Sequence, residues 1–121
     1  MQKRLGPLGF ADGFVVGANN FLSEVDNHVD WGIIEKELSG IYRSSTGRPS
    51  YPLLVLFKTL LLQQWYSLSD PGMEEALCDR ISFRRFVGLS LSEEIPDHST
   101  ISRFRGKLGD RYDRLLSSLN N

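Results

Sequence analysis

The chain has 121 residues, of which 40% are hydrophobic and 24% charged, and its net charge is −1. This length and composition suit one small globular domain and exclude a chain that is disordered through most of its length. The single cysteine, Cys78, has no second cysteine to pair with, so we expect a reducing, cytoplasmic compartment.

Charge is divided unevenly along the chain. Residues 11–79 contain 10 acidic and 4 basic side chains, whereas residues 80–114 contain 5 acidic and 8 basic ones. A basic second half is expected where one surface of a protein meets phosphate groups. Because the asymmetry is modest, we interpret the chain as a targeting module rather than a freestanding repressor.

The first third of the chain predicts short helices after an irregular start. Glycines and a proline interrupt residues 1–20, so we expect a poorly structured lead-in and no signal peptide there. Residues 21–25 favour one short helical face. Asp30 is expected to cap a helix over residues 31–38, which ends before a Ser-Gly pair.

Residues 41–50, IYRSSTGRPS, predict a loop because serine, threonine, glycine and proline dominate them. Arg43 and Arg48 are isolated positive charges in this loop. Either arginine has the chemistry to contact a phosphate, although solvated loop arginines are more common.

The strongest helix prediction covers residues 51–66, YPLLVLFKTLLLQQWY. Its apolar residues lie nearly all round the helix, which is typical of a buried central helix, and Pro52 suits the first turn. Polar residues, including Lys58 and Gln63, break the apolar run well before the roughly 20 residues that a membrane span needs.

The next helix is expected over residues 71–79, with Ser69 or Asp70 as its N-cap and a proline in its first turn. Cys78 lies on this helix beside the expected core stripe. No histidine is placed by sequence to activate it, so a buried, inert thiol is expected rather than a nucleophile.

A further short helix is expected from Ser82 to Gly88, where the glycine ends it. It should expose Arg84 and Arg85 on its outer side. Its expected buried residues are Phe83, Phe86 and Val87.

Residues 95–108, IPDHSTISRFRGKL, predict a capped helix with two unlike faces. Pro96 favours an extended residue before the helix, and Asp97 or Ser99 can accept the first backbone hydrogen bonds. Helical spacing separates an apolar stripe from a small-polar and basic face. The stripe is Ile101, Phe104 and Leu108, and the opposite face holds Ser99, Ser102, Arg103, Gly106 and Lys107.

The polar face of this helix has the chemistry of a surface that docks on DNA. Hydroxyl and guanidinium groups hydrogen-bond phosphates and base edges, and arginine grips guanine through two parallel bonds. Together with the two helices before it, the capped helix forms a three-helix array with a long turn, as in helix-turn-helix modules. A merely solvated helix face is the equally weighted alternative. Residues 112–119 have helical spacing in a final segment.

Four segments carry more than a generic pattern: GRPSYP, LLQQWYSLSDPGMEEAL, SFRRFVGLSL and IPDHSTISRFR. Together they closely resemble the N-terminal domain of bacterial insertion-sequence transposases of type five, in the Asp-Asp-Glu transposase family. The resemblance covers residues 47–108 well and reaches back more weakly to about Phe21.

The resemblance implies a domain order and a partner. Such transposases place a helical DNA-binding domain, which is thought to recognise terminal inverted repeats, before a ribonuclease-H-like catalytic domain. By this comparison residues 21–109 are the helical DNA-binding domain, and residues 110–121 are a helical tail leading towards a catalytic domain that we expect to be absent. The implied partner is double-stranded DNA at the ends of the element, with a homodimer as a further option and a location at the bacterial nucleoid.

We expect no catalytic activity, metal site or cofactor in this chain. The family's catalytic domain uses an Asp, Asp, Glu triad with two Mg²⁺ ions, so magnesium is expected only in the missing part. His28 and His98 lie in separate segments with one cysteine, which falls short of a zinc site, and no nucleotide-binding motif is present. Neither a membrane nor a small-molecule substrate is expected as a partner.

The sequence therefore predicts an all-α, small helical domain with a buried central helix and a helix-turn-helix-like C-terminal half. Its predicted function is the recognition of terminal inverted repeats in DNA transposition. Arg105 lies near the edge of the apolar face, where a structural ion pair competes with a DNA contact. Two alternatives stay open, a transposase subunit-interaction module and a stand-alone DNA-binding regulator from a truncated element. The predicted DNA-contacting residues are Ser99, Thr100, Ser102, Arg103, Lys107, Arg84 and Arg85.

Overall fold

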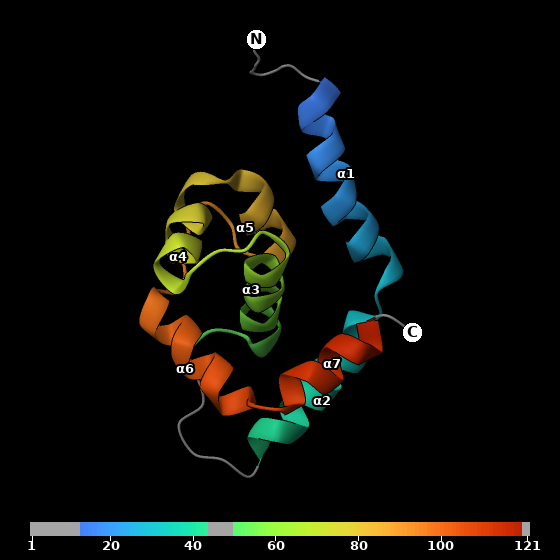
Figure 1. The fold of residues 1–121 in the computed structure, drawn as a ribbon, viewed down its shortest axis with the longest axis vertical. Helices are drawn as coiled ribbons and strands as arrows, with labels where there is room; N and C mark the ends of the chain where they lie inside the picture. The colour runs from blue at the N-terminus through green and yellow to red at the C-terminus, as the bar shows by residue number, and fades with distance from the viewer. Residues whose placement is uncertain (1–12, 44–49, 120–121) are drawn as a thin grey trace.

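All regular structure in the described part of the chain is α-helical, as predicted. The computed structural model describes residues 13–43 and 50–119 (Figure 1). The helices are α1 (Gly13–His28), α2 (Trp31–Arg43), α3 (Leu53–Trp65), α4 (Asp70–Asp79), α5 (Ile81–Val87), α6 (His98–Leu108) and α7 (Arg111–Leu119). None of the helices in these two ranges is long and apolar enough to cross a membrane.

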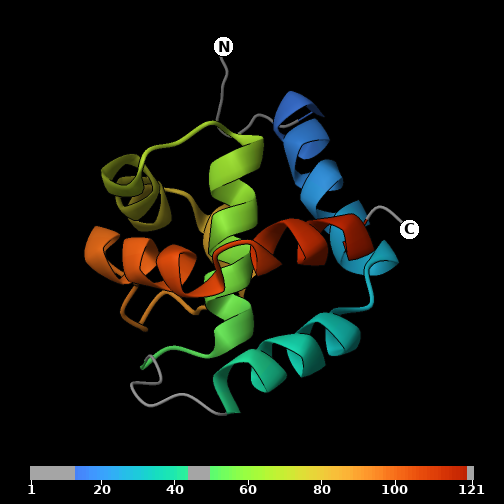
Figure 2. The same cartoon turned by 60° about the horizontal axis from the view of Figure 1, so that its bottom comes forward.

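The predicted central helix is confirmed as α3. It packs against α2, α4, α5 and α6, and Figure 2 shows it running through the middle of the molecule. Phe57, Leu61 and Leu62 are fully buried, and all but three residues of the helix, Leu54, Gln64 and Trp65, are buried as well. A helix that is apolar all round has no solvent face to offer, so it becomes the core on which the other helices pack.

Lys58 is a buried residue of α3, and its side chain joins three helices. Its Nζ donates to Asp26 Oδ1 of α1 at 3.1 Å and to the carbonyl oxygen of Phe86 in α5 at 3.0 Å. The same Nζ lies 4.3 Å from the centre of the Trp31 ring. A buried charge is tolerated only with such partners, so Lys58 fixes α1 and α5 on the central helix.

α1 is longer than the sequence predicts. It begins at Gly13, so residues 13–20 are helical where a poorly structured lead-in is expected, and residues 1–12 lie outside the described residues. Leu22 is buried, and Phe21 packs edge-on against Trp65 with ring centroids 5.4 Å apart. Once the turn of α1 that contains Phe21 and Leu22 is packed on the core, each residue added towards the N-terminus contributes one more backbone hydrogen bond. This gain explains why the helix starts earlier than predicted.

α2 begins where predicted but extends past Leu38 to Arg43. Asp30 caps it by accepting a hydrogen bond from the backbone of the first turn at 3.1 Å. Ile34, Leu38 and Tyr42 are all buried and lie four residues apart, so the apolar stripe continues beyond the Ser-Gly pair. The predicted end at Leu38 is therefore wrong, because burial of Tyr42 outweighs the local tendency to stop.

The predicted array of three helices in the second half is formed by α4, α5 and α6. The side chain of Ser69 caps α4 by accepting from Gly72 N–H at 3.1 Å. Arg80 alone separates α4 from α5, and Gly88, with φ of 96°, ends α5 in the left-handed conformation. Residues 88–97 then connect α5 to α6, and α4 packs against both.

The expectation of a buried thiol at Cys78 is wrong, because the residue is exposed. α4 turns Met73, Ala76 and Leu77 towards the core. The position after Leu77 is rotated by about 100° from it, which carries Cys78 away from the core.

Candidate nucleic-acid interface

The capped start of α6 is confirmed. Asp97 is extended, with φ of −82° and ψ of 171°, and its Oδ1 accepts a hydrogen bond from Thr100 N–H at 2.8 Å. This backbone hydrogen bond lowers the pKa of the Asp97 carboxyl below its ordinary value. The carboxylate thus satisfies one of the unpaired N–H groups at the helix start and fixes where the helix begins.

The two faces of α6 are separated as the sequence predicts. Ile101, Phe104 and Leu108 are buried against the rest of the domain. Thr100 is half-buried at the boundary between the faces. The exposed residues on the outer face are Ser99, Ser102, Arg103, Gly106 and Lys107.

α4 holds the first residue of α6 through Glu74. Its Oε1 accepts hydrogen bonds from both the backbone N–H and the Nδ1 of His98, each at 2.8 Å. The bond to the His98 ring lowers the pKa of Glu74 and raises the pKa of His98. No local sequence pattern indicates this pair, because its members lie 24 residues apart and Glu74 has an ordinary local role at a helix start.

α4 and α3 also hold the second half of α6. Arg105 donates through Nη1 and Nη2 to the two carboxylate oxygens of Asp70, and its Nη2 also donates to Gln63 Oε1 at 2.6 Å. The hydrogen bonds from Arg105 lower the pKa of Asp70. Arg105 therefore forms the structural ion pair that competes with a DNA contact, and Asp70 serves this pair while Ser69 caps α4.

The C-terminal part of α2 borders the second half of α6. The Tyr42 and Phe104 rings are stacked, with centroids 6.1 Å apart and planes within 8° of parallel. Lys107 Nζ lies 5.7 Å from the centre of the Tyr42 ring. The ammonium group therefore stands above an aromatic face at the edge of the polar surface. Of the predicted loop arginines, Arg43 ends α2 and Arg48 lies outside the described residues.

Arg84 is not the exposed residue that the sequence predicts. It is half-buried, and its Nε donates to the Leu77 carbonyl oxygen at 2.7 Å. Its Nη1 donates to the carbonyl oxygens of Ser90 and Leu91 at 3.2 and 3.1 Å. The guanidinium group thus ties the end of α4 to the turn after α5, because these carbonyls have no helical partner of their own.

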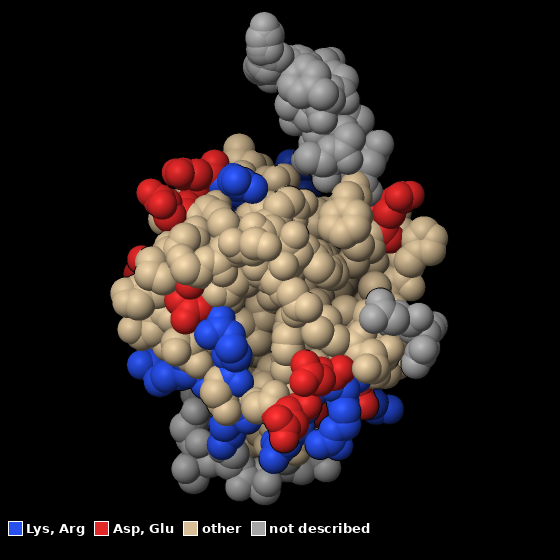
Figure 3. Space-filling view, in the orientation of Figure 1, with Lys and Arg blue, Asp and Glu red and all other residues tan. Residues whose placement is uncertain are grey.

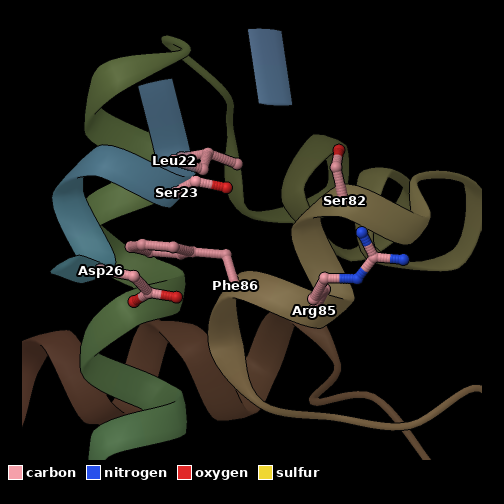
Figure 4. Close-up of a pocket in the computed structure, with 6 residues that line it drawn as sticks. All are labelled: Leu22, Ser23, Asp26, Ser82, Arg85 and Phe86. Carbon is pink, nitrogen blue, oxygen red and sulfur yellow. The ribbon is translucent and has the colours of Figure 1, made fainter. Parts of the chain in front are cut away.

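Arg85 is exposed as predicted, but it lies beside α1 in a pocket that no residue of α6 lines. It lines a narrow pocket of about 40 Å³ between α1 and α5, and Figure 4 shows its guanidinium group near Ser82. Across the pocket stand Leu22, Ser23 and Asp26 of α1. The structure therefore gathers Ser99, Ser102, Arg103 and Lys107 on one helix and leaves the two α5 arginines elsewhere.

Charged side chains are unevenly spread over the surface. In Figure 3 the visible Lys and Arg side chains gather towards the lower part of the face, around α6, α7 and α2, mixed with Asp and Glu, while the centre is uncharged. Basic and acidic side chains are therefore mixed in this part of the surface.

Comparison with known families identifies the chain. A family model described as Transposase domain (DUF772) matches residues 11–107. The chain belongs to this transposase-domain family. No solved structure matches it.

The match to the transposase domain includes all of α1 to α5 and all but the last residue of α6. Within the described residues of the transposase domain, no group of three histidine, cysteine, aspartate or glutamate side chains is arranged to hold a metal ion.

Proposed function

We propose that this transposase domain binds double-stranded DNA through the outer face of α6 and so recognises the terminal inverted repeats of an insertion sequence. In this proposal the chain is the N-terminal part of a transposase of type five and does not itself cut DNA. Strand transfer, with its Asp-Asp-Glu triad and Mg²⁺ ions, belongs to a separate domain.

One observation carries the proposal: three sets of contacts hold α6 in place, while its outer face is exposed. The buried stripe anchors it to the core, Glu74 holds its first residue, and Asp70 holds Arg105. A reading helix needs this rigidity, because a side chain that is free to shift by an ångström loses its geometry with a base. The outer face presents two hydroxyls and two cations.

The positions along α6 suggest different roles for these side chains. In helix-turn-helix proteins the N-terminal residues of the recognition helix contact base edges. Ser99, Ser102 and Arg103 occupy this part, with Thr100 helping at the helix start, and Arg103 has the geometry to pair with guanine. Lys107 lies one turn further on, where a phosphate contact is expected.

Arg84 and Arg85 are not included in the proposed DNA surface. The Nε and Nη1 of Arg84 already donate to three backbone carbonyls. Arg85 faces the pocket beside α1.

The test is a fluorescence anisotropy titration of the domain with an end-of-element duplex and a scrambled duplex at several salt concentrations. Arg103→Ala should reduce discrimination by about 1 to 3 kcal/mol at one base pair. Lys107→Ala should weaken both duplexes alike and reduce the salt slope by about 1. Arg85→Ala, which removes one positive charge from another surface, is the matched control.

Equal binding by the wild type and by the Arg103 and Lys107 variants would reject the α6 surface. If the domain binds neither duplex but forms a dimer in sedimentation experiments, the subunit-interaction alternative takes its place. Binding to both duplexes with no preference between them would reject repeat recognition and leave only general DNA affinity.

A further inference from the structure

A groove lies between α2 and α7, next to the proposed DNA surface. Its volume is about 460 Å³. Its α2 rim consists of Glu37, Gly40 and Ile41, and its α7 rim consists of Arg111, Arg114 and Leu115.

The α7 rim is held firmly by the core. Leu115 is buried, and Tyr112 donates a hydrogen bond to Gln64 Oε1 of α3 at 2.8 Å. The Tyr112 ring also packs edge-on against Phe57, with centroids 5.9 Å apart. Because these contacts anchor α7, they also hold the backbone of the neighbouring arginines in place.

Arg111 and Arg114 have no carboxylate partner of their own. Both are exposed, and neither forms an ion pair with a carboxylate of the described residues. They share a helical face with Leu115 at i, i+3 and i+4, and neither Asp110 nor Asp113 lines the groove. The α7 rim is therefore positive although α7 as a whole carries both signs.

The groove lies beyond the C-terminal end of α6, the helix that is proposed to contact DNA. Figure 2 shows α6 and α7 end to end across one side of the molecule, separated by a break at Gly109, where φ is 53°. An 11-residue helix such as α6 is about 16 Å long, whereas the major groove of DNA is about 12 Å wide. When the start of α6 contacts bases, the residues that follow α6 reach the phosphate backbone at the edge of the DNA major groove.

We propose that Arg111 and Arg114 bind the sugar-phosphate backbone beside the segment that α6 reads. This inference rests on the proposed function and extends its contact surface onto α7. The two guanidinium groups fix the register of α6 on the duplex without reading sequence, since phosphate contacts position a protein and base contacts specify. Glu37 on the opposite rim keeps the backbone on the α7 side by repulsion.

The experiment compares Arg111→Gln, Arg114→Gln and Arg85→Gln in the same titrations. Each α7 variant should lower the slope of log K against log salt by about 0.9, which is about eightfold in affinity at 0.1 M salt. The ratio between end and scrambled duplexes should stay unchanged. Arg111→Lys and Arg114→Lys should keep the wild-type slope, because the contact needs a positive charge.

Failure of this inference is distinguishable from failure of the proposed function. If the wild type binds and Arg103→Ala loses discrimination, yet neither α7 variant changes the slope, only the α7 contact is overturned. An equal loss in Arg85→Gln assigns the effect to net charge and also overturns it. A wild type that binds no duplex at low salt overturns both proposals. Glu37→Gln should tighten binding to both duplexes, and weaker binding contradicts the placement of the backbone.

Discussion

Lys58 offers the most direct test of how the helices are held together. Lys58→Ala removes three methylene groups from a buried stem, which at about 0.8 kcal/mol each is about 2.4 kcal/mol. It also removes the charged donor to the Phe86 carbonyl and to Asp26, for which about 2 kcal/mol is expected. The total predicted loss in the free energy of unfolding is about 4 kcal/mol.

Lys58→Met separates these two contributions. Methionine keeps a long apolar stem in the same space but has no donor, so its cost should be about 2 kcal/mol. The Asp26 side chain is 39% exposed, and solvent therefore screens its attraction to the ammonium group. A double-mutant cycle of Lys58→Met with Asp26→Asn should accordingly give a coupling of about 1 kcal/mol or less.

Urea unfolding followed by far-ultraviolet circular dichroism measures these values, with an unchanged denaturant slope as the check that only native stability has changed. Equal losses in Lys58→Met and Lys58→Ala would refute the contribution of the stem. Losses below about 1 kcal/mol in both variants would refute the burial of Lys58 as the joint between α1, α3 and α5.

Three further predictions concern individual side chains. Asp97→Ala should lower the urea midpoint of unfolding through loss of the α6 cap, whereas Asp97→Ser should recover most of the loss. Equal losses in the two variants would contradict capping. His98 has a raised pKa in the fold, so its bond to Glu74 stabilises the protein fully below pH 6.5, and this stabilisation is lost as the pH rises through the folded pKa. In His98→Gln the free energy of unfolding should vary less with pH in this range, and an unchanged pH profile would contradict the pair. Burial raises the pKa of Tyr112 to about 12, so the free energy of unfolding should fall between pH 10 and 12, because the phenol ionises first in the unfolded chain. Tyr112→Phe should remove the last step of the tyrosine absorbance titration. If that step remains in the variant, the burial of Tyr112 is contradicted.

Local chemistry made some elements predictable. Asp30, Ser69, Asp97 and Gly88 are residues whose capping or left-handed preferences act within a few positions of the backbone, and each marks a helix boundary in the structure. The central helix was predictable for a different reason, since a segment that is apolar all round has no other stable location than the core.

Residues whose roles depend on distant partners were not predictable. Arg84 has the sequence of an exposed arginine, yet it binds the carbonyls of a turn whose path only the packed fold defines. Cys78 lies beside apolar residues in sequence, and its exposure follows from the rotation of α4 on its neighbours. The Ser-Gly pair of α2 has helix-ending character, but burial of Tyr42 carries the helix onward.

For the proposed DNA surface, periodicity in the sequence was enough to determine which side chains of α6 turn outward, because helical geometry relates neighbours at i, i+3 and i+4 whatever surrounds them. The tertiary structure decided what stands beside that face. Glu74 and Asp70 bind residues of α6 that lie 24 and 35 positions further along the chain, and Arg85 lies beside α1. Contacts between helices depend on how whole apolar faces pack, and no short-range pattern in a single chain records that choice.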